Sequence, residues 1–295
     1  MIATAALATL LAACSNDSDV FNTPDYADTP IGLNVNVSPM ATRAGYEQGA
    51  LTEGSFGLYL TTQDTEGDER YNCTNREVRY ESGWTIQGEQ LLWKSNDATV
   101  TYYAYLPYTG IVSDATNYAF TVQTDQSTED NVKASDLLCT GQQPATPGTA
   151  LDITFKHALS KLNVTLKKGS ELEDGQNLTF TSVTLSNCAT ATTVNLTDGT
   201  TDTATKSQTI TLYAATANEK YECILVPQTF AQSLKVEITD DNGKVYTFTS
   251  NKGLTFASGK QYTLNLTVGR DKVTTGTISA ESWDNEQQGG DLVTE

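Results

Sequence analysis

The sequence predicts an all-β protein with two sandwich-like domains in series. Short segments in which apolar and polar residues alternate recur along almost the whole chain, as expected for half-buried strands. Tyrosine, with 14 copies, outnumbers phenylalanine with 8 and tryptophan with 3 together, and Thr, Asn, Asp and Gly dominate the polar residues; both features are typical of strands joined by tight turns. No helical periodicity extends over 12 or more residues. A chain of 295 residues that is 38% hydrophobic has the material for two domains of ordinary size.

The N-terminal segment predicts export and lipid anchoring. Residues 2–13 are almost all apolar or small and are followed by Cys14. Because a bilayer span needs about 20 apolar residues, we predict a signal peptide over residues 1–13 and no transmembrane helix there. The preceding Leu-Ala-Ala resembles a bacterial lipobox, which implies that Cys14 carries several acyl chains, enough for stable anchoring. Residues 14–29 are then a lipidated tether, and their acidic start resembles the signal that sends lipoproteins of Bacteroidota to the outer face of the outer membrane.

The first sandwich domain is expected over residues 30–150. It begins with a clear alternation, in which one face of a strand carries Ile31, Leu33, Val35 and Val37 and the other carries Gly32, Asn34, Asn36 and Ser38. Further strands are expected over residues 55–62, 100–108 and 117–123. We expect a loop over residues 124–135, and an irregular surface loop over residues 141–148, which hold two prolines and two glycines.

The second sandwich domain is expected over residues 151–295, where strand patterns follow at short and regular spacing. The alternation places Leu162, Val164 and Leu166 inward and Lys161, Asn163, Thr165 and Lys167 outward. A hairpin is expected over residues 236–248, because two alternating runs are joined by Asp240, Asp241, Asn242 and Gly243, of which the last two suit positive φ angles.

Charge and cysteine spacing exclude two classes of function. With a net charge of −18 and a pI near 4.3, the chain repels phosphate backbones, so nucleic-acid binding is not expected. The remaining cysteines, Cys73, Cys139, Cys188 and Cys223, form no C-x-x-C motif, and one histidine cannot complete a zinc site with them. Two disulfides and four semi-buried thiols both remain open. We expect no metal site and no cofactor.

The sequence contains no recognisable catalytic motif. It has neither G-x-S-x-G nor S-x-x-K, and a near match to a phosphate loop at residues 253–260 has the wrong spacing and is followed by Gln261 instead of Ser or Thr. The only histidine, His157, is flanked by two strand patterns, and we interpret it as a structural residue at a turn. Asp240, Asp241 and Asn242 are explained by the hairpin better than by calcium binding. We therefore expect that the chain is not an enzyme and has no catalytic residues.

The order and spacing of several short stretches resemble the fimbrillins, the pilin-like surface lipoproteins of Bacteroidota, over nearly their whole length. The matching stretches are the lipobox at Cys14, MATRA (40–44), SFGLYL (55–60), Trp93 followed by VTYYAYLPY (100–108), FKHALSKLNVTL (155–166), ILVPQTF (224–230), GKQYTLNLTV (259–268) and ISAESW (278–283). The resemblance implies two transthyretin-like β-sandwich domains. It also implies that HALSKL begins the C-terminal domain, so that His157 marks a domain junction.

The resemblance further implies a fimbrial subunit that polymerises by donor-strand exchange. A trypsin-like surface protease would cut between Arg43 and Ala44, and the strand bearing Ile31, Leu33, Val35 and Val37 would then leave. A segment from another fimbrial subunit would fill the groove. Four vacated pockets correspond to about 6–12 kcal/mol of unburied apolar surface. A donor segment of this chain could use Ile278, Ala280 and Trp283.

Two further questions stay open in the sequence. The alternative function is a monomeric surface lipoprotein that binds a glycan or a host protein, with Trp84, Trp93 or tyrosines as a sugar platform, although core packing also explains such aromatics. The second question is whether the subunit forms the stalk, the tip or the anchor of a fimbrium, and which ligand it binds on a host or bacterial surface. In either case we expect an outer-membrane lipoprotein at the cell surface or in the fimbrium.

Overall fold

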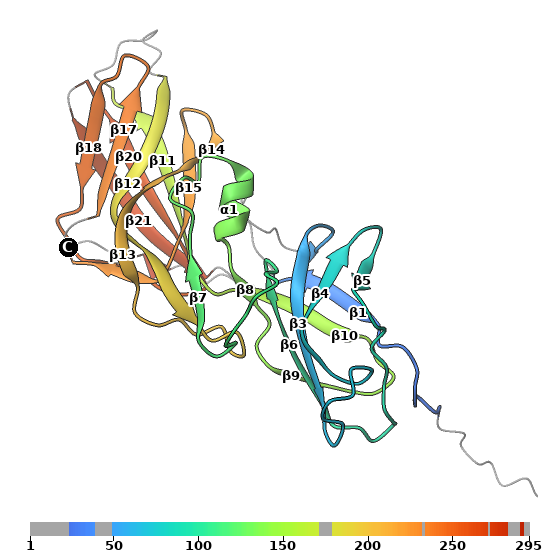
Figure 1. Cartoon of the computed structure of the whole chain (residues 1–295). Coiled ribbons are helices and arrows are strands. Elements are labelled where there is room, and N and C mark those ends of the chain that lie inside the picture. The colour runs from blue at the N-terminus through green and yellow to red at the C-terminus, as the bar shows by residue number, and fades with distance from the viewer. Residues whose placement is uncertain are drawn as a thin grey trace, which may run out of the picture.

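The computed structural model is almost entirely β, which confirms the predicted fold class. It describes residues 24–38, 49–170, 179–231, 234–270, 272–282 and 290–291. Two β lobes lie end to end, with the helix α1 (Glu129–Ser135) beside the place where they meet (Figure 1). No helix in the described ranges is long and apolar enough to cross a membrane.

One nine-stranded sheet forms the first lobe, in the order β2-β1-β10-β8-β6-β3-β4-β5 with β9 paired to β6. Its strands are β1 (Leu33–Val37), β2 (Gly49–Ala50), β3 (Ser55–Thr62), β4 (Cys73–Tyr80), β5 (Trp84–Ile86), β6 (Val100–Leu106), β8 (Leu138–Cys139), β9 (Gln143–Ala145) and β10 (Leu151–His157). The sheet curls until its edges meet. A hydrogen bond joins them: Trp84 Nε1 in β5 donates to the carbonyl oxygen of Leu51, just after β2, at 2.9 Å.

The curled sheet encloses a core of its own. Phe56 of β3 is fully buried in it, with its ring 5.3 Å from that of Phe155 in β10 and 5.0 Å from that of Trp84. Trp93 is also part of this core and is only 2% exposed. The two edges of the sheet are therefore joined by apolar packing as well as by the Trp84 hydrogen bond.

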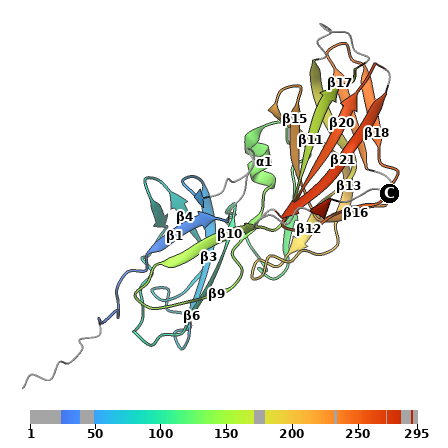
Figure 2. The same ribbon diagram turned by 180° about the vertical axis from the view of Figure 1, so that it is seen from behind.

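Two packed sheets form the second lobe. One has the order β14-β15-β11-β20-β21-β22, the other the order β13-β12-β17-β18 with β7 paired to β12, and β16 pairs separately with β19. The strands are β7 (Tyr118–Thr121), β11 (Ser160–Lys168), β12 (Phe180–Val194), β13 (Thr205–Thr211), β14 (Tyr213–Thr216), β15 (Lys220–Leu225), β16 (Gln228–Phe230), β17 (Lys235–Asp240), β18 (Val245–Thr249), β19 (Leu254–Phe256), β20 (Lys260–Val268), β21 (Val273–Ser282) and β22 (Gly290–Asp291). Seen from behind, β21 and β20 run beside β11 along this lobe (Figure 2).

The predicted hairpin joins β17 to β18. Its turn is formed by Asp240, Asp241 and Asn242, the residues for which calcium binding was the other explanation. Asp240 Oδ1 accepts the backbone N–H groups of Asn242 at 2.9 Å and Lys244 at 2.8 Å, and Gly243 has a φ angle of +79°. The Asp240 carboxylate is thus occupied by the turn itself.

The two lobes are interleaved along the chain. The strand expected to open the second domain, β10, instead lies in the sheet of the first lobe, whereas β7 and α1, which precede it, pack with the second. The chain passes from β10 to β11 through Ala158 and Leu159, seven residues beyond the boundary expected at 150/151. Alternation predicts that a segment is a strand, but it does not say which sheet the strand joins.

Two segments expected to be loops contain regular structure. Helix α1 occupies part of residues 124–135: Thr128 caps it by accepting the N–H of Asn131 at 3.3 Å, and acidic residues fill its first turn. Strand β9 lies within residues 141–148. Both elements are too short to give a periodic signal in the sequence.

Candidate functional site: the β1 groove

Strand β1 lies between two other strands, although it is close to the beginning of the described chain. Five consecutive residues pair with β10 in parallel, from Leu33 opposite Leu151 to Val37 opposite Phe155. On its other side, β1 pairs with the two residues of β2 in antiparallel orientation. The strand therefore fills a gap in the sheet and is not its edge.

The apolar face of this segment points into the first core, as the alternation predicted. Ile31, Val35 and Val37 are buried, with exposed fractions of 4%, 6% and 2%, whereas Leu33 is only partly buried. At roughly 1.5–3 kcal/mol for each fully buried aliphatic side chain, the three buried residues contribute about 5–9 kcal/mol. The contribution is smaller than that of four filled pockets because Leu33 remains partly in solvent.

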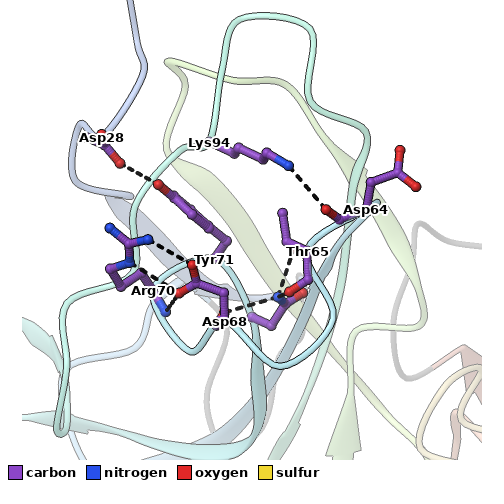
Figure 3. A network of polar contacts seen from close by, with 8 residues as sticks. Asp28, Asp64, Thr65, Asp68, Arg70, Tyr71 and Lys94 are labelled. Carbon is purple, nitrogen blue, oxygen red and sulfur yellow. Dashed lines mark hydrogen bonds and ion pairs between the residues drawn. The ribbon is translucent and has the colours of Figure 1, made fainter.

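A second set of contacts holds the residues just before β1. Asp28 N–H donates to the carbonyl oxygen of Trp93 at 2.7 Å, and Tyr71 Oη donates to Asp28 Oδ1 at 2.5 Å (Figure 3). Beside them, Arg70 makes two hydrogen bonds to the Asp68 carboxylate and lies 5.0 Å above the Tyr71 ring. The hydrogen bond to Asp28 raises the pKa of Tyr71 above its ordinary value, because ionisation would remove the donated proton.

The other sequence-predicted site residues either belong to the second lobe or fall outside the described part of the chain. Cys14, Arg43, Ala44 and Trp283 lie outside the described residues. Ile278 and Ala280 belong to β21 in the second lobe, where they face Leu264 and Tyr262 of β20 and pack partly buried against the second core. A strand that donates these residues would first have to leave its own sheet.

His157 is buried at the end of β10, where the chain leaves the first lobe. Its Nδ1 lies 2.8 Å from Oδ1 of Asp136, the residue that follows α1. The next residues are fixed from both sides, since Ala158 N–H donates to the Leu137 carbonyl at 2.9 Å and Gly259 N–H donates to the Leu159 carbonyl at 2.8 Å. The contacts around His157 tie together the elements at the junction of the two lobes.

The sequence missed a buried ion pair next to this junction. Lys161, expected to face solvent, is fully buried, and its Nζ lies 2.9 Å from Glu222 Oε2 on the neighbouring strand β15. Gln126, just before α1, exchanges two hydrogen bonds with the backbone of Ile224, two residues beyond Glu222 in β15. Alternation assigned Lys161 to the correct face of β11, but it could not show that another part of the chain covers that face.

The remaining candidates are structural. Trp93 is a core residue, and Trp84 is partly buried and donates to Leu51, so neither forms an open sugar platform. All four described cysteines are buried and unpaired, and burial raises the pKa values of Cys73, Cys139 and Cys188 to about 12, which keeps these thiols unreactive. Across the described residues, no three His, Cys, Asp or Glu side chains are grouped to hold a metal ion.

Comparison with known proteins finds similarity to fimbrial proteins. The model of a family described as fimbrillin-like matches residues 42–283. A protein of Bacteroides uniformis provisionally named fimbrium subunit Fim1C is 27% identical over 292 residues, which cover 96% of this chain and 94% of that protein.

Solved structures show the same fold. A provisionally assigned cell adhesion protein of Bacteroides uniformis superposes with a TM-score of 0.63 at 24% identity, covering 85% of this chain and 98% of that one. A corresponding protein of Bacteroides ovatus also gives a TM-score of 0.63, at 20% identity, with 88% and 100% covered. The tip fimbrial protein Mfa3 of Porphyromonas gingivalis gives 0.50 at 10% identity, with 88% and 100% covered.

Proposed function

The chain belongs to the fimbrillin-like family, and on that premise we propose that it polymerises by exchanging β1 for a strand of another fimbrial subunit. Family membership makes it a structural protein of cell-surface fimbriae and not an enzyme. The finer proposal includes a lipid on Cys14 that anchors the precursor to the outer membrane, and a trypsin-like surface protease that cuts between Arg43 and Ala44. A surface ligand for adhesion belongs to the same proposal.

The position of β1 supports strand exchange best. Because β1 is the first of the described strands, a single cut between β1 and β2 separates it from all the others. Its departure would leave the backbone of β10 without a partner over five residues and expose apolar surface worth about 5–9 kcal/mol. A strand with the same alternation would restore both interactions, which is the energetic basis of β-strand addition.

Cleavage after Arg43 would couple release from the membrane to opening of the groove. Residues 14–43 hold both the lipidated cysteine and the whole of β1, so one cut would remove the anchor and the resident strand together. Until then β1 would block the site, which prevents polymerisation before the subunit reaches the surface.

The test compares Arg43→Ala with Arg270→Ala, which changes an exposed arginine in the turn between β20 and β21. The N-terminal sequence of mature surface protein should begin at Ala44 in wild type and in Arg270→Ala, and both should polymerise. Arg43→Ala should remain lipidated, folded and monomeric. A mature wild-type protein that begins at Cys14, with equal polymer content in all three, contradicts the proposal and favours a monomeric surface adhesin.

A further inference from the structure

The short strand β2 would remain with the mature chain when β1 leaves. Asn36 and Val37 of β1 face Ala50 and Gly49 of β2, and Leu51 N–H donates to the Val35 carbonyl at 3.4 Å. Because β2 follows Arg43 in the sequence, the proposed cut leaves it attached to β3. The question is what holds β2 once its partner strand is gone.

The first support for β2 comes from the opposite edge of the sheet. Trp84 of β5 donates its indole N–H to the Leu51 carbonyl at 2.9 Å, and its ring packs 5.0 Å from that of Phe56. Leu51 itself is only 6% exposed and belongs to the first core. The Trp84 hydrogen bond and the Trp84–Phe56 ring contact use no atom of β1.

The second support comes from the other lobe. Lys133 of α1 extends its Nζ to Oε1 of Glu53 at 2.7 Å, and the same nitrogen lies 3.1 Å from Glu129 on its own helix. Next to Glu53, the Gly54 carbonyl accepts the N–H of Tyr80 in β4 at 3.1 Å. The segment from Gly49 to Gly54 is thus tied to β4, β5 and α1.

We propose that Gly49 to Glu53 stays in place when β1 leaves and forms the second wall of the groove. This inference rests on the proposed function. The strand of the second subunit then binds between β10 and β2, parallel to the first and antiparallel to the second, with alternate apolar side chains in the pockets of Ile31, Val35 and Val37. Such a strand is hydrogen-bonded along both sides near its end, whereas a strand added to an open edge is bonded along one side only.

A disulfide test locates the bound strand. The full chain carrying Ala50→Cys is cut at Arg43 and mixed with an excess of a labelled peptide of residues 30–38 carrying Asn36→Cys. Because Asn36 faces Ala50, and Ala50 is exposed, mild oxidation should cross-link the peptide to position 50. Thr61→Cys, on an exposed residue of β3, which β10, β8 and β6 separate from β1 in the sheet, is the control and should give no cross-link.

The two levels of the proposal fail differently. If the cut wild-type chain takes up no strand peptide, the proposed exchange is wrong and this inference falls with it. If peptide is taken up but position 50 does not cross-link, exchange stands and the second wall does not exist.

A second measurement is independent of added cysteines. Glu53→Gln should speed dissociation of the labelled peptide about two-fold, and Trp84→Phe, which removes the indole donor, about five-fold. Glu129→Gln is the matched control, since it removes the other carboxylate bound to Lys133 and leaves β2 untouched; its rate should equal that of wild type. Wild-type dissociation rates in both Glu53→Gln and Trp84→Phe would overturn the inference.

Discussion

Strands β1 and β11 look alike in the sequence, yet the structure gives them opposite roles. Both alternate apolar and polar residues, and both pair in parallel with a strand far along the chain. β11 pairs over nine residues with β20 and over six with β15, and it continues directly from the junction between the lobes. β1 pairs over five residues with β10 and over two with β2, and it is the first strand of the part of the chain that the structure describes. A strand can therefore be exchangeable only where its topology lets it leave without dismantling the rest of the fold.

The buried ion pair of β11 provides the largest expected difference between the two strands. Glu222→Leu should lower the free energy of unfolding by about 3–5 kcal/mol, because the charge of Lys161 would remain buried without its carboxylate. The double variant with Lys161→Met should recover most of the loss. Urea denaturation measures both, with Glu77→Gln at the exposed pair with Arg79 as the control, expected to change stability by under about 1 kcal/mol. Equal losses in the single and double variants would show that the two side chains do not interact as a pair.

Truncation inside β1 should matter only while β1 is present. Val35→Ala should cost the uncut chain about 2 kcal/mol, since its side chain is 6% exposed in the first core. After cleavage at Arg43 and gel filtration under native conditions, which separates any segment that dissociates, the same variant should match wild type in urea denaturation. Leu162→Ala in β11, 1% exposed, is the control and should be destabilising by about 2–5 kcal/mol in both forms. A loss that persists in the cleaved form would mean that β1 does not leave.

Alkaline pH should destabilise the folded chain through a buried thiol in each lobe. Burial raises the pKa of Cys73 in the first lobe and of Cys188 in the second from 9.0 to about 12. The folded chain therefore holds these protons more tightly than the unfolded chain, and stability should fall as pH rises from about 9 to about 12, by up to about 1.4 kcal/mol per pH unit for each thiol. Cys73→Ala and Cys188→Ala should each make this decline less steep, as measured by urea denaturation at several pH values. Variants that retain the full decline would assign it to the buried tyrosines instead.

The smallest expected effect concerns the contacts that precede β1. Asp28→Asn should weaken the hydrogen bond from Tyr71 Oη, because a neutral amide oxygen is a poorer acceptor than a carboxylate. After cleavage at Arg43, dissociation of the released segment should become about five-fold faster, corresponding to about 1 kcal/mol. Asp114→Asn, in a turn remote from β1, is the control and should leave the rate unchanged. An unchanged rate in Asp28→Asn would show that only β1 itself holds the segment.

Most strands of the candidate site could be predicted from the sequence, but their neighbours could not. The period of two placed Ile31, Val35 and Val37 on one buried face, and the Asn-Gly turn predicted the β17–β18 hairpin. The helix α1 was missed because two turns leave no periodic signal, and its Thr128 cap with acidic residues behind it was the only local clue.

The sequence by itself determined the all-β class, the inward faces of β1 and β11 and the absence of a recognisable catalytic motif, because these depend on side-chain period and local motifs. Only the tertiary structure decided that β10 belongs with the first lobe, that Lys161 is buried against Glu222, and that β1 lies between β10 and β2. The physical reason is that pairing partners and the covering of a strand face come from segments far apart in the chain. Alternation within one strand carries no information about which of those segments it will meet.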